Sequence, residues 1–248
     1  KMHACGHDGH TTMLLAAGLS SVAPALRSAR SALSQARTVG RARHVWWPLA
    51  LLVVVHGGYF RPGVDLTHAR PMARALADLG WRVVLAEYRR VPGDPGAALE
   101  DLQRLDEHLR RTGHDVAAWV GHSAGGALVM WRALHPDLPP VRVLALAPVA
   151  DFDTAITDRL GGDAVRDWVG ATPDRAPEVY ARLDPSRLCS ADPGAAGRVA
   201  VLHGDEDASV PLRQSDGWAR TVLTGAHHFD VVDPASPHWP AVVAALPG

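Results

Sequence analysis

From about residue 44 onward, short apolar runs alternate regularly with longer amphipathic segments. The apolar runs include LALLVVV, WRVVL, VAAWV, VRVLALAPV and RVAVL. Strands that are apolar on both faces and separated by helices are typical of a parallel sheet covered on both sides. The pattern therefore predicts an α/β fold with a doubly wound, mostly parallel sheet, in which ligands bind at the carboxyl ends of the strands.

The strongest motif is GHSAGG at residues 121–126, which fits the nucleophile-elbow pattern G-x-S-x-G. A strand-like run (VAAWV) precedes it and a helix-like run (ALVMWRAL) follows it. A serine on such a sharp strand-to-helix turn has a strained backbone, and small neighbours keep adjacent chains from clashing with it. We expect the hydroxyl of Ser123 to project above the sheet, where the following helix N-terminus favours developing negative charge.

A second motif, HGGYF at residues 56–60, ends the first long apolar run. Adjacent glycines let backbone N–H groups approach a ligand closely, as an oxyanion hole requires. The N–H of Gly57, Gly58 or Tyr59 is expected to donate one hydrogen bond to the oxyanion. The N–H of Ala124 is expected to donate a second. The alternative is a tight turn that uses glycine for its conformation alone.

A serine nucleophile needs a base and an acid that orients the base, and in this architecture they follow the serine in the order Asp, His. The segment VLHGDEDASVP supplies the acid, for which we choose Asp207 on its spacing, with Asp205 as the alternative. The segment GAHHFDVVDP supplies the base after a last short strand, TVL. His228 is preferred there over its neighbour His227.

Together these residues resemble an α/β-hydrolase over residues 44–248, and most closely the esterase and arylformamidase (kynurenine formamidase-like) branch. HGGYF is similar to the oxyanion turn of that branch, GHSAGG matches its elbow, and HHFDVVD resembles the segment that carries its catalytic histidine, hence His228. The resemblance implies hydrolysis of a carboxylic ester or aryl formamide through an acyl-enzyme, with no cofactor and no metal.

The opening segment KMHACGHDGHTTMLL is similar to the metal-binding segment of amidohydrolases related to aminoacylase and hippurate hydrolase. In that family, the residues matching Cys5 and His7 are metal ligands, and thiolate and imidazole both hold zinc. A catalytic site needs at least three ligands and an open position. No acidic residue follows Asp8 until Asp65, so the family's downstream glutamate pair is missing. We interpret the segment as a fragment joined to a hydrolase.

We expect two parts in the chain. Residues 1–43 form an N-terminal extension, made of this fragment and an arginine-rich linker or helix, for which a transit peptide is the alternative. Residues 44–248 form the hydrolase domain, without the strand pair that usually precedes the first long strand. About residues 151–190 are expected to form a small helical cap, in which Trp168 or Tyr180 either lines an aromatic substrate pocket or packs the cap against the domain.

Composition bears on the partners. There are 25 basic and 26 acidic residues, so nothing in the net charge of −1 favours nucleic acid or an anionic membrane. No apolar run approaches the roughly 20 residues that span a bilayer. Two cysteines, Cys5 and Cys189, suit a reducing, cytoplasmic compartment. The expected partner is a small ester or amide. The alternatives are a metal-dependent amidohydrolase that uses Cys5 and His7, and a non-catalytic protein with a hydrolase fold.

Overall fold

A computed structural model describes residues 14–15 and 50–247. In this part of the chain one sheet has the strand order β1-β3-β2-β4-β5-β6-β7. Neighbouring strands pair in parallel, except that β1 runs antiparallel to β3. The predicted α/β class with a mostly parallel sheet is therefore confirmed. The strands are β1 (Leu14–Leu15), β2 (Leu51–Val55), β3 (Arg82–Ala86), β4 (Val116–His122), β5 (Val143–Leu146), β6 (Val199–Gly204) and β7 (Arg220–Leu223).

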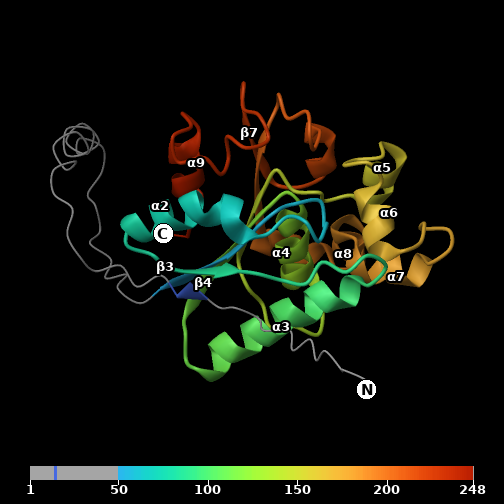
Figure 1. The fold of residues 1–248 in the computed structure, drawn as a ribbon, viewed down its shortest axis with the longest axis horizontal. Coiled ribbons are helices and arrows are strands. Elements are labelled where there is room, and N and C mark those ends of the chain that lie inside the picture. Colours follow the sequence, from blue (N-terminus) through green and yellow to red (C-terminus); the bar gives the residue numbers. More distant parts are fainter. Residues whose placement is uncertain (1–13, 16–49, 248) are drawn as a thin grey trace, which may run out of the picture.

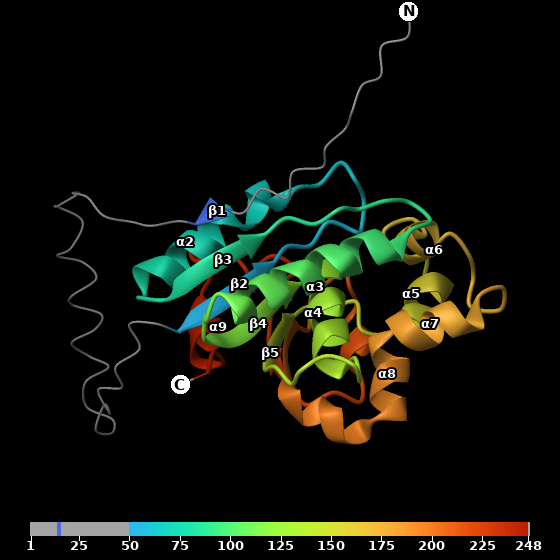
Figure 2. The same ribbon diagram turned by 90° about the horizontal axis from the view of Figure 1, so that it is seen from below.

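Helices cover both faces of the sheet and gather at one of its ends (Figures 1 and 2). Within the described ranges, none of them is long and apolar enough to cross a bilayer. The helices beside the sheet are α2 (Arg70–Asp78), α3 (Pro95–Arg111), α4 (Ala124–Leu134) and α9 (Trp239–Ala244). Those at the end are α5 (Phe152–Thr157), α6 (Ala164–Val169), α7 (Pro177–Leu183) and α8 (Pro185–Ala191). The connections that the structure describes contain the 3₁₀ turns η2 (Leu66–Ala69), η3 (Pro193–Arg198) and η4 (Leu212–Ser215).

Strand β2 shows why the apolar runs are continuous rather than alternating. All five of its residues are buried. Leu52 and Val54 belong to the core cluster that includes α2 and α9, whereas Leu51, Val53 and Val55 belong to the cluster that includes α3 and α4. Successive side chains of a strand point to opposite faces, so a strand covered on both faces needs an apolar residue at every position.

At the edge of the sheet beside β3, a two-residue strand stands in place of the usual strand pair. No strand was predicted in residues 1–43, but Leu14 and Leu15 of β1 pair with Leu85 and Val84 of β3. An edge strand leaves a row of unpaired N–H and C=O groups that another segment can satisfy through its backbone alone. A two-residue strand is too short to show periodicity in the sequence, which is why it was missed.

The cap predicted for residues 151–190 contains helices α5 to α8, which gather at one end of the sheet in both views (Figures 1 and 2). Of its two aromatic candidates, Trp168 is 2% exposed and Tyr180 0%, and both belong to the core cluster on the α3 and α4 side. Both side chains pack the cap against the domain, which is one of the two roles expected for them. Trp168 also borders a hollow of about 370 Å³ beside Phe60 and Arg61.

A buried ion pair joins α3 to α4. The Arg132 guanidinium donates to Asp106 Oδ2 at 2.8 Å and to the carbonyl of Pro139 at 2.8 Å. Both charged side chains are almost fully buried. Burial lowers the pKa of Arg132, and Asp106 opposes this shift by stabilising the cation.

We expect Asp106→Leu to lower the free energy of unfolding by about 3 to 5 kcal/mol, because it leaves the guanidinium buried without its carboxylate. Urea titration of the folded protein measures this loss. The double variant Asp106→Leu/Arg132→Met removes both charges and should recover most of the stability. Glu107→Leu, at the exposed neighbouring position, is the control and should change stability little. Equal losses in the single and double variants would contradict the prediction.

Candidate active site

Ser123 lies between the last residue of β4 and the first residue of α4. Its backbone has φ 56° and ψ −120°, a conformation that non-glycine residues rarely adopt. The Ser123 N–H donates to the carbonyl of Leu146 at 2.9 Å, and its own carbonyl accepts from the N–H of Val149 at 3.3 Å. These bonds to and just after β5 keep the strained turn in place.

The glycines of the elbow are required by close backbone contacts. A Cβ on Gly121 would lie 2.3 Å from the carbonyl oxygen of Gly125. A Cβ on Gly125 would lie 2.3 Å from the carbonyl oxygen of Val55. The helix that follows Ser123 therefore packs against β2 and β4 more closely than any side chain permits. This is the physical basis of the G-x-S-x-G spacing in this chain.

His228 and Asp207 meet at the carboxyl end of the sheet. His228 follows β7 and Asp207 follows β6, and His228 Nδ1 donates to Asp207 Oδ2 at 2.7 Å. The second carboxylate oxygen of Asp207 accepts from the N–H groups of Ser209 at 2.9 Å and Val210 at 2.8 Å. Both side chains are almost fully buried. The acid loop thus holds the carboxylate in one orientation.

The two alternative residues lie elsewhere. Asp205 accepts from the backbone N–H of Gly225 at 2.7 Å, and no contact between Asp205 and His228 occurs among the described residues. The His227 side chain is exposed, and its Nδ1 donates to the carbonyl of Glu206 at 3.0 Å. The structure therefore brings Asp207 and His228 together and leaves Asp205 and His227 at the surface.

Two histidines set the charge of Asp207. Burial by itself disfavours the carboxylate, but contacts from His203 and His228 outweigh this and hold the pKa of Asp207 well below its usual range. His203 is fully buried, with its Nε2 2.8 Å from the carbonyl of Val210 and 3.5 Å from Asp207 Oδ2. The carboxylate is therefore ionised across the physiological pH range, and it favours the tautomer of His228 that carries a proton on Nδ1.

Ser123 and His228 line one pocket of about 300 Å³, whose wall is mostly apolar. A pocket of this size is at the small end of those that bind organic ligands. The residues that line it are Gly58, Tyr59, Val64, His68, His122, Ser123, His228 and Phe229.

The glycine turn predicted as an oxyanion hole borders this pocket. A Cβ on Gly57 would lie 3.0 Å from the Cβ of Ser123, so the backbone of the turn passes directly beside the serine. Gly58 has φ 127°, and a Cβ there would lie 2.6 Å from a methyl group of Val64. Tyr59 follows with φ 55°. Ala124, on the other side of the serine, is the first residue of α4 and is fully buried.

A polar network supports the turn from behind. The ring of His56 has Nδ1 2.6 Å from the carbonyl of Gly57 and Nε2 3.1 Å from Glu87 Oε1. Tyr88 donates its hydroxyl to the carbonyl of His56 at 2.9 Å. Burial opposes ionisation of Glu87, but its contacts with His56 and Arg90 prevail and lower its pKa to about 2. A carboxylate thus stabilises the first residue of the turn.

Sequence reasoning missed His122, which contacts the proposed base directly. His122 Nε2 donates to the backbone carbonyl of His228 at 2.9 Å, and the two ring centroids are 4.5 Å apart. Burial, followed by repulsion from His228, lowers the pKa of His122 to about 3, so this ring stays neutral near pH 7. His122 lies inside the elbow motif. However, contact between residues so far apart in sequence leaves no local signal.

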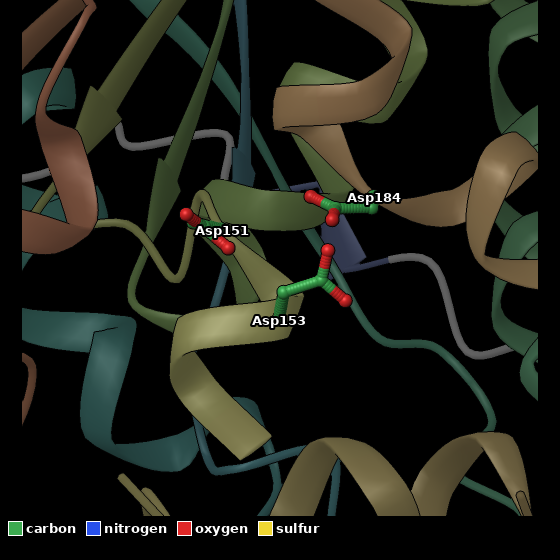
Figure 3. A group of neighbouring side chains, drawn as sticks. All are labelled: Asp151, Asp153 and Asp184. Carbon is green, nitrogen blue, oxygen red and sulfur yellow. The ribbon is translucent and has the colours of Figure 1, made fainter. Parts of the chain in front are cut away.

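Three acidic side chains of the described residues, Asp151, Asp153 and Asp184, have oxygens within 4.8 Å of one another (Figure 3). Asp151 and Asp184 cap α5 and α8 by accepting from backbone N–H groups. Arg187 donates to Asp153 at 2.7 Å and lies 3.6 Å from Asp184, so it supplies the compensating charge. Capping and this ion pair explain why the three carboxylates lie together. Cys5 and His7, the two metal ligands that the resemblance of the opening segment implies, lie outside the described residues.

Within this cluster, burial raises the pKa of Asp184 from 3.8 to about 6. The folded protein therefore holds a proton that the unfolded chain releases between these pH values, and its stability falls as the pH rises through this window. This fall in the free energy of unfolding is about 2 to 3 kcal/mol. We expect Asp184→Asn, which keeps the capping oxygen, to remove it. Urea titrations between pH 4 and pH 7 measure this slope. The exposed Asp153→Asn is the control, and an unchanged slope in Asp184→Asn would contradict the prediction.

Residues 99–243 match the prolyl oligopeptidase family. Among curated proteins, a probable carboxylic ester hydrolase of Mycobacterium tuberculosis, LipM, is 30% identical over 191 residues, which is 68% of this chain and 43% of that protein. The chain thus spans less than half the length of this relative.

Solved structures of esterases share the fold. An esterase/lipase from an uncultured bacterium has a TM-score of 0.61 at 22% identity, with coverage of 82% of this chain and 76% of its own. Carboxyl esterase 2 from the fungus Tuber melanosporum has a TM-score of 0.58 at 19% identity, with coverage of 79% and 74%. At these identities the likeness is one of architecture, and it shows an α/β-hydrolase fold.

Proposed function

This chain belongs to the prolyl oligopeptidase family, and from that premise we propose that it is a serine hydrolase that cleaves small carboxylic esters through an acyl-enzyme intermediate. Ester hydrolysis, rather than cleavage of a peptide bond, is favoured by the similarity to a probable carboxylic ester hydrolase. The small, mostly apolar pocket beside Ser123 favours a compact acyl group.

One observation carries the proposal. Ser123 and His228 line the same pocket, and the Nδ1 of that histidine donates to the buried Asp207 at 2.7 Å. With its proton on Nδ1, the ring of His228 has a free lone pair on Nε2 with which it can accept the proton of a serine hydroxyl. A strained serine, a histidine in this tautomer and an ionised acid are what nucleophilic acyl transfer requires.

In the proposed mechanism Ser123 Oγ attacks the ester carbonyl carbon while His228 Nε2 takes the hydroxyl proton. The carbonyl oxygen becomes negative and binds the N–H of Ala124 and an N–H of the Gly57–Tyr59 turn. Asp207 stabilises the imidazolium, which then protonates the leaving alkoxide as the C–O bond breaks. Water attacks the acyl-enzyme with His228 as the base. The imidazolium then returns this proton to Ser123 Oγ as the bond from the acyl carbon to Oγ breaks, which releases the acid and free Ser123.

A second substrate class follows from the similarity of HGGYF and HHFDVVD to the arylformamidase branch. Aryl formamides are proposed as additional substrates, because a formyl group is the smallest acyl group and fits a pocket of about 300 Å³. The same residues would act, with His228 protonating the departing aryl amine.

A fluorophosphonate probe tests the nucleophile. We expect it to label the protein stoichiometrically, with the adduct on the peptide that contains Ser123, and we expect EDTA to leave both labelling and hydrolysis of p-nitrophenyl acetate unchanged. Ser236→Ala, which removes another buried serine, is the control and should be labelled like wild type. Activity that EDTA abolishes, without labelling of Ser123, would favour a metal-dependent amidohydrolase instead. A folded protein with neither labelling nor activity would favour a non-catalytic protein.

A further inference from the structure

The glycine turn that borders the pocket continues into two further residues with unfavourable backbone conformations. Tyr59 and Phe60 have φ of 55° and 56°, directly after Gly58 at 127°. Left-handed backbone at a non-glycine residue costs roughly 1 to 2 kcal/mol, so two in succession need support from surrounding structure. Within the turn, the N–H of Arg61 donates to the carbonyl of Gly58 at 3.0 Å.

The support comes from the cap. Phe60 is almost fully buried, and its ring stacks on the indole of Trp168 in α6 with centroids 4.1 Å apart and planes 9° apart. The same ring is roughly perpendicular to that of Phe152 in α5, with the planes 79° apart and the centroids 6.3 Å apart. Phe60 is therefore held between two cap helices, which gather at one end of the sheet (Figure 2).

The neighbours of Phe60 contact the loop between α5 and α6. A Cβ on Gly161 would lie 2.2 Å from Cδ1 of Tyr59, so the tyrosine ring rests directly on the glycine backbone. The guanidinium of Arg61 donates to the carbonyl oxygens of Gly161 at 2.5 Å and Gly162 at 3.1 Å. Three consecutive side chains of the turn thus contact the cap.

The cap loop has one ion pair within it and a second that ties its first residue to another part of the fold. Arg159 donates to Asp163 at 2.8 Å within the loop. Asp158 accepts from Arg213 at 2.5 Å, and Arg213 belongs to η4, which follows the segment that carries Asp207. These ion pairs stabilise the loop that contacts the turn.

We propose that Trp168, and Arg61 through its hydrogen bonds to the Gly161 and Gly162 carbonyls, are positioning residues, which hold the Gly57–Tyr59 turn in the strained conformation that presents its N–H group to the oxyanion. The proposal rests on the function proposed above. The bound ester has a neutral carbonyl, and the oxyanion forms only in the tetrahedral intermediates and the transition states that flank them. Loss of this support therefore lowers kcat and leaves KM nearly unchanged. Loss of this support also lowers the enzyme's preference for a carbonyl oxygen over a larger atom that accepts hydrogen bonds more weakly at the same position.

The test compares an ester with its thionoester, in which sulfur replaces the carbonyl oxygen. In Trp168→Leu and Arg61→Gln we expect kcat for the ester to fall by about 10- to 100-fold, a part of the effect of losing one oxyanion donor. KM is expected to stay within about twofold, and the ratio of ester to thionoester kcat/KM should fall with kcat. Trp168→Phe, which retains an aromatic ring against Phe60, should restore most of both values.

Leu188→Ala is the matched control, since Leu188 is buried in α8 and does not line the serine's pocket. It should keep the wild-type ratio even if it melts earlier. Arg61→Gln removes only exposed hydrogen bonds, so it tests the same support if Trp168→Leu fails to fold. If the wild type hydrolyses esters, and Arg61→Gln and Trp168→Leu both keep the wild-type ratio of ester to thionoester kcat/KM, the inference is overturned and the proposed function stands. A wild type that is not labelled at Ser123 would overturn the proposed function, and the inference with it.

Discussion

Ser123→Ala is expected to lower kcat for p-nitrophenyl acetate by at least about 10⁴-fold, the loss that removal of a nucleophile causes in other triads. Without the hydroxyl no acyl-enzyme forms, and only the pocket and the oxyanion donors remain to assist attack by water. Steady-state kinetics with active-site titration of the wild type measures the loss.

The substitution should leave the fold intact. Alanine differs from serine by one oxygen, and no hydrogen bond from Ser123 Oγ occurs among the described residues, whereas both of its backbone groups are bonded near β5. The melting temperature should therefore stay close to that of wild type. Ser236→Ala is the control for loss of a buried hydroxyl. Undiminished turnover by folded Ser123→Ala would refute the assignment of the nucleophile.

Asp207→Asn is expected to lower kcat by about 10⁴-fold, by the same comparison with other triads. The carboxylate accepts the Nδ1 proton of His228 at 2.7 Å. An amide in its place can donate its own N–H to Nδ1, which puts the histidine proton on Nε2 and blocks acceptance of the serine proton. KM for the ester should change little, because Asp207 does not line the pocket.

Asp205→Asn is the matched control, because Asp205 lies two residues away and caps the backbone of Gly225 instead. Its kcat should remain within a few-fold of wild type. If Asp205→Asn proves more damaging than Asp207→Asn, the acid has been assigned to the wrong carboxylate.

Asp207→Asn should also change the stability of the protein at low pH. Folding lowers the pKa of Asp207, so its ionised form stabilises the fold above its unfolded value of about 4. This contribution is lost as the pH falls through the folded pKa. Urea titration at successive pH values should show a flatter acid limb for Asp207→Asn than for wild type. Its absolute stability near pH 7 should also be lower, because the charge-assisted hydrogen bond from His228 Nδ1 to the carboxylate is gone.

Much of the fold was predictable because its causes are local. The continuous apolar runs reflect strands covered on two faces, and the helical cap predicted at about residues 151–190 contains α5 to α8. The edge partner of β3 was not predictable, since two residues of backbone pairing leave no pattern.

The candidate site divides in the same way. The elbow and the HGGYF turn require glycine where a Cβ would collide with backbone or side chain, and this demand is visible in the chain as written. Asp205 and Asp207 are two residues apart, and either is chemically able to serve as the acid. The path of the loop after β6 decides that only Asp207 reaches His228.

The sequence by itself determined the class of the fold, the sharp turn at Ser123 and the glycine turn beside it. Each of these depends on the steric and apolar character of residues that are neighbours in the chain. Only the tertiary structure decided which acid meets which histidine, that His122 contacts the base, and that Trp168 and Gly161 of the cap support the turn. Those contacts join segments far apart in sequence. Their geometry depends on how the helices pack on the sheet, which no local pattern of residues records.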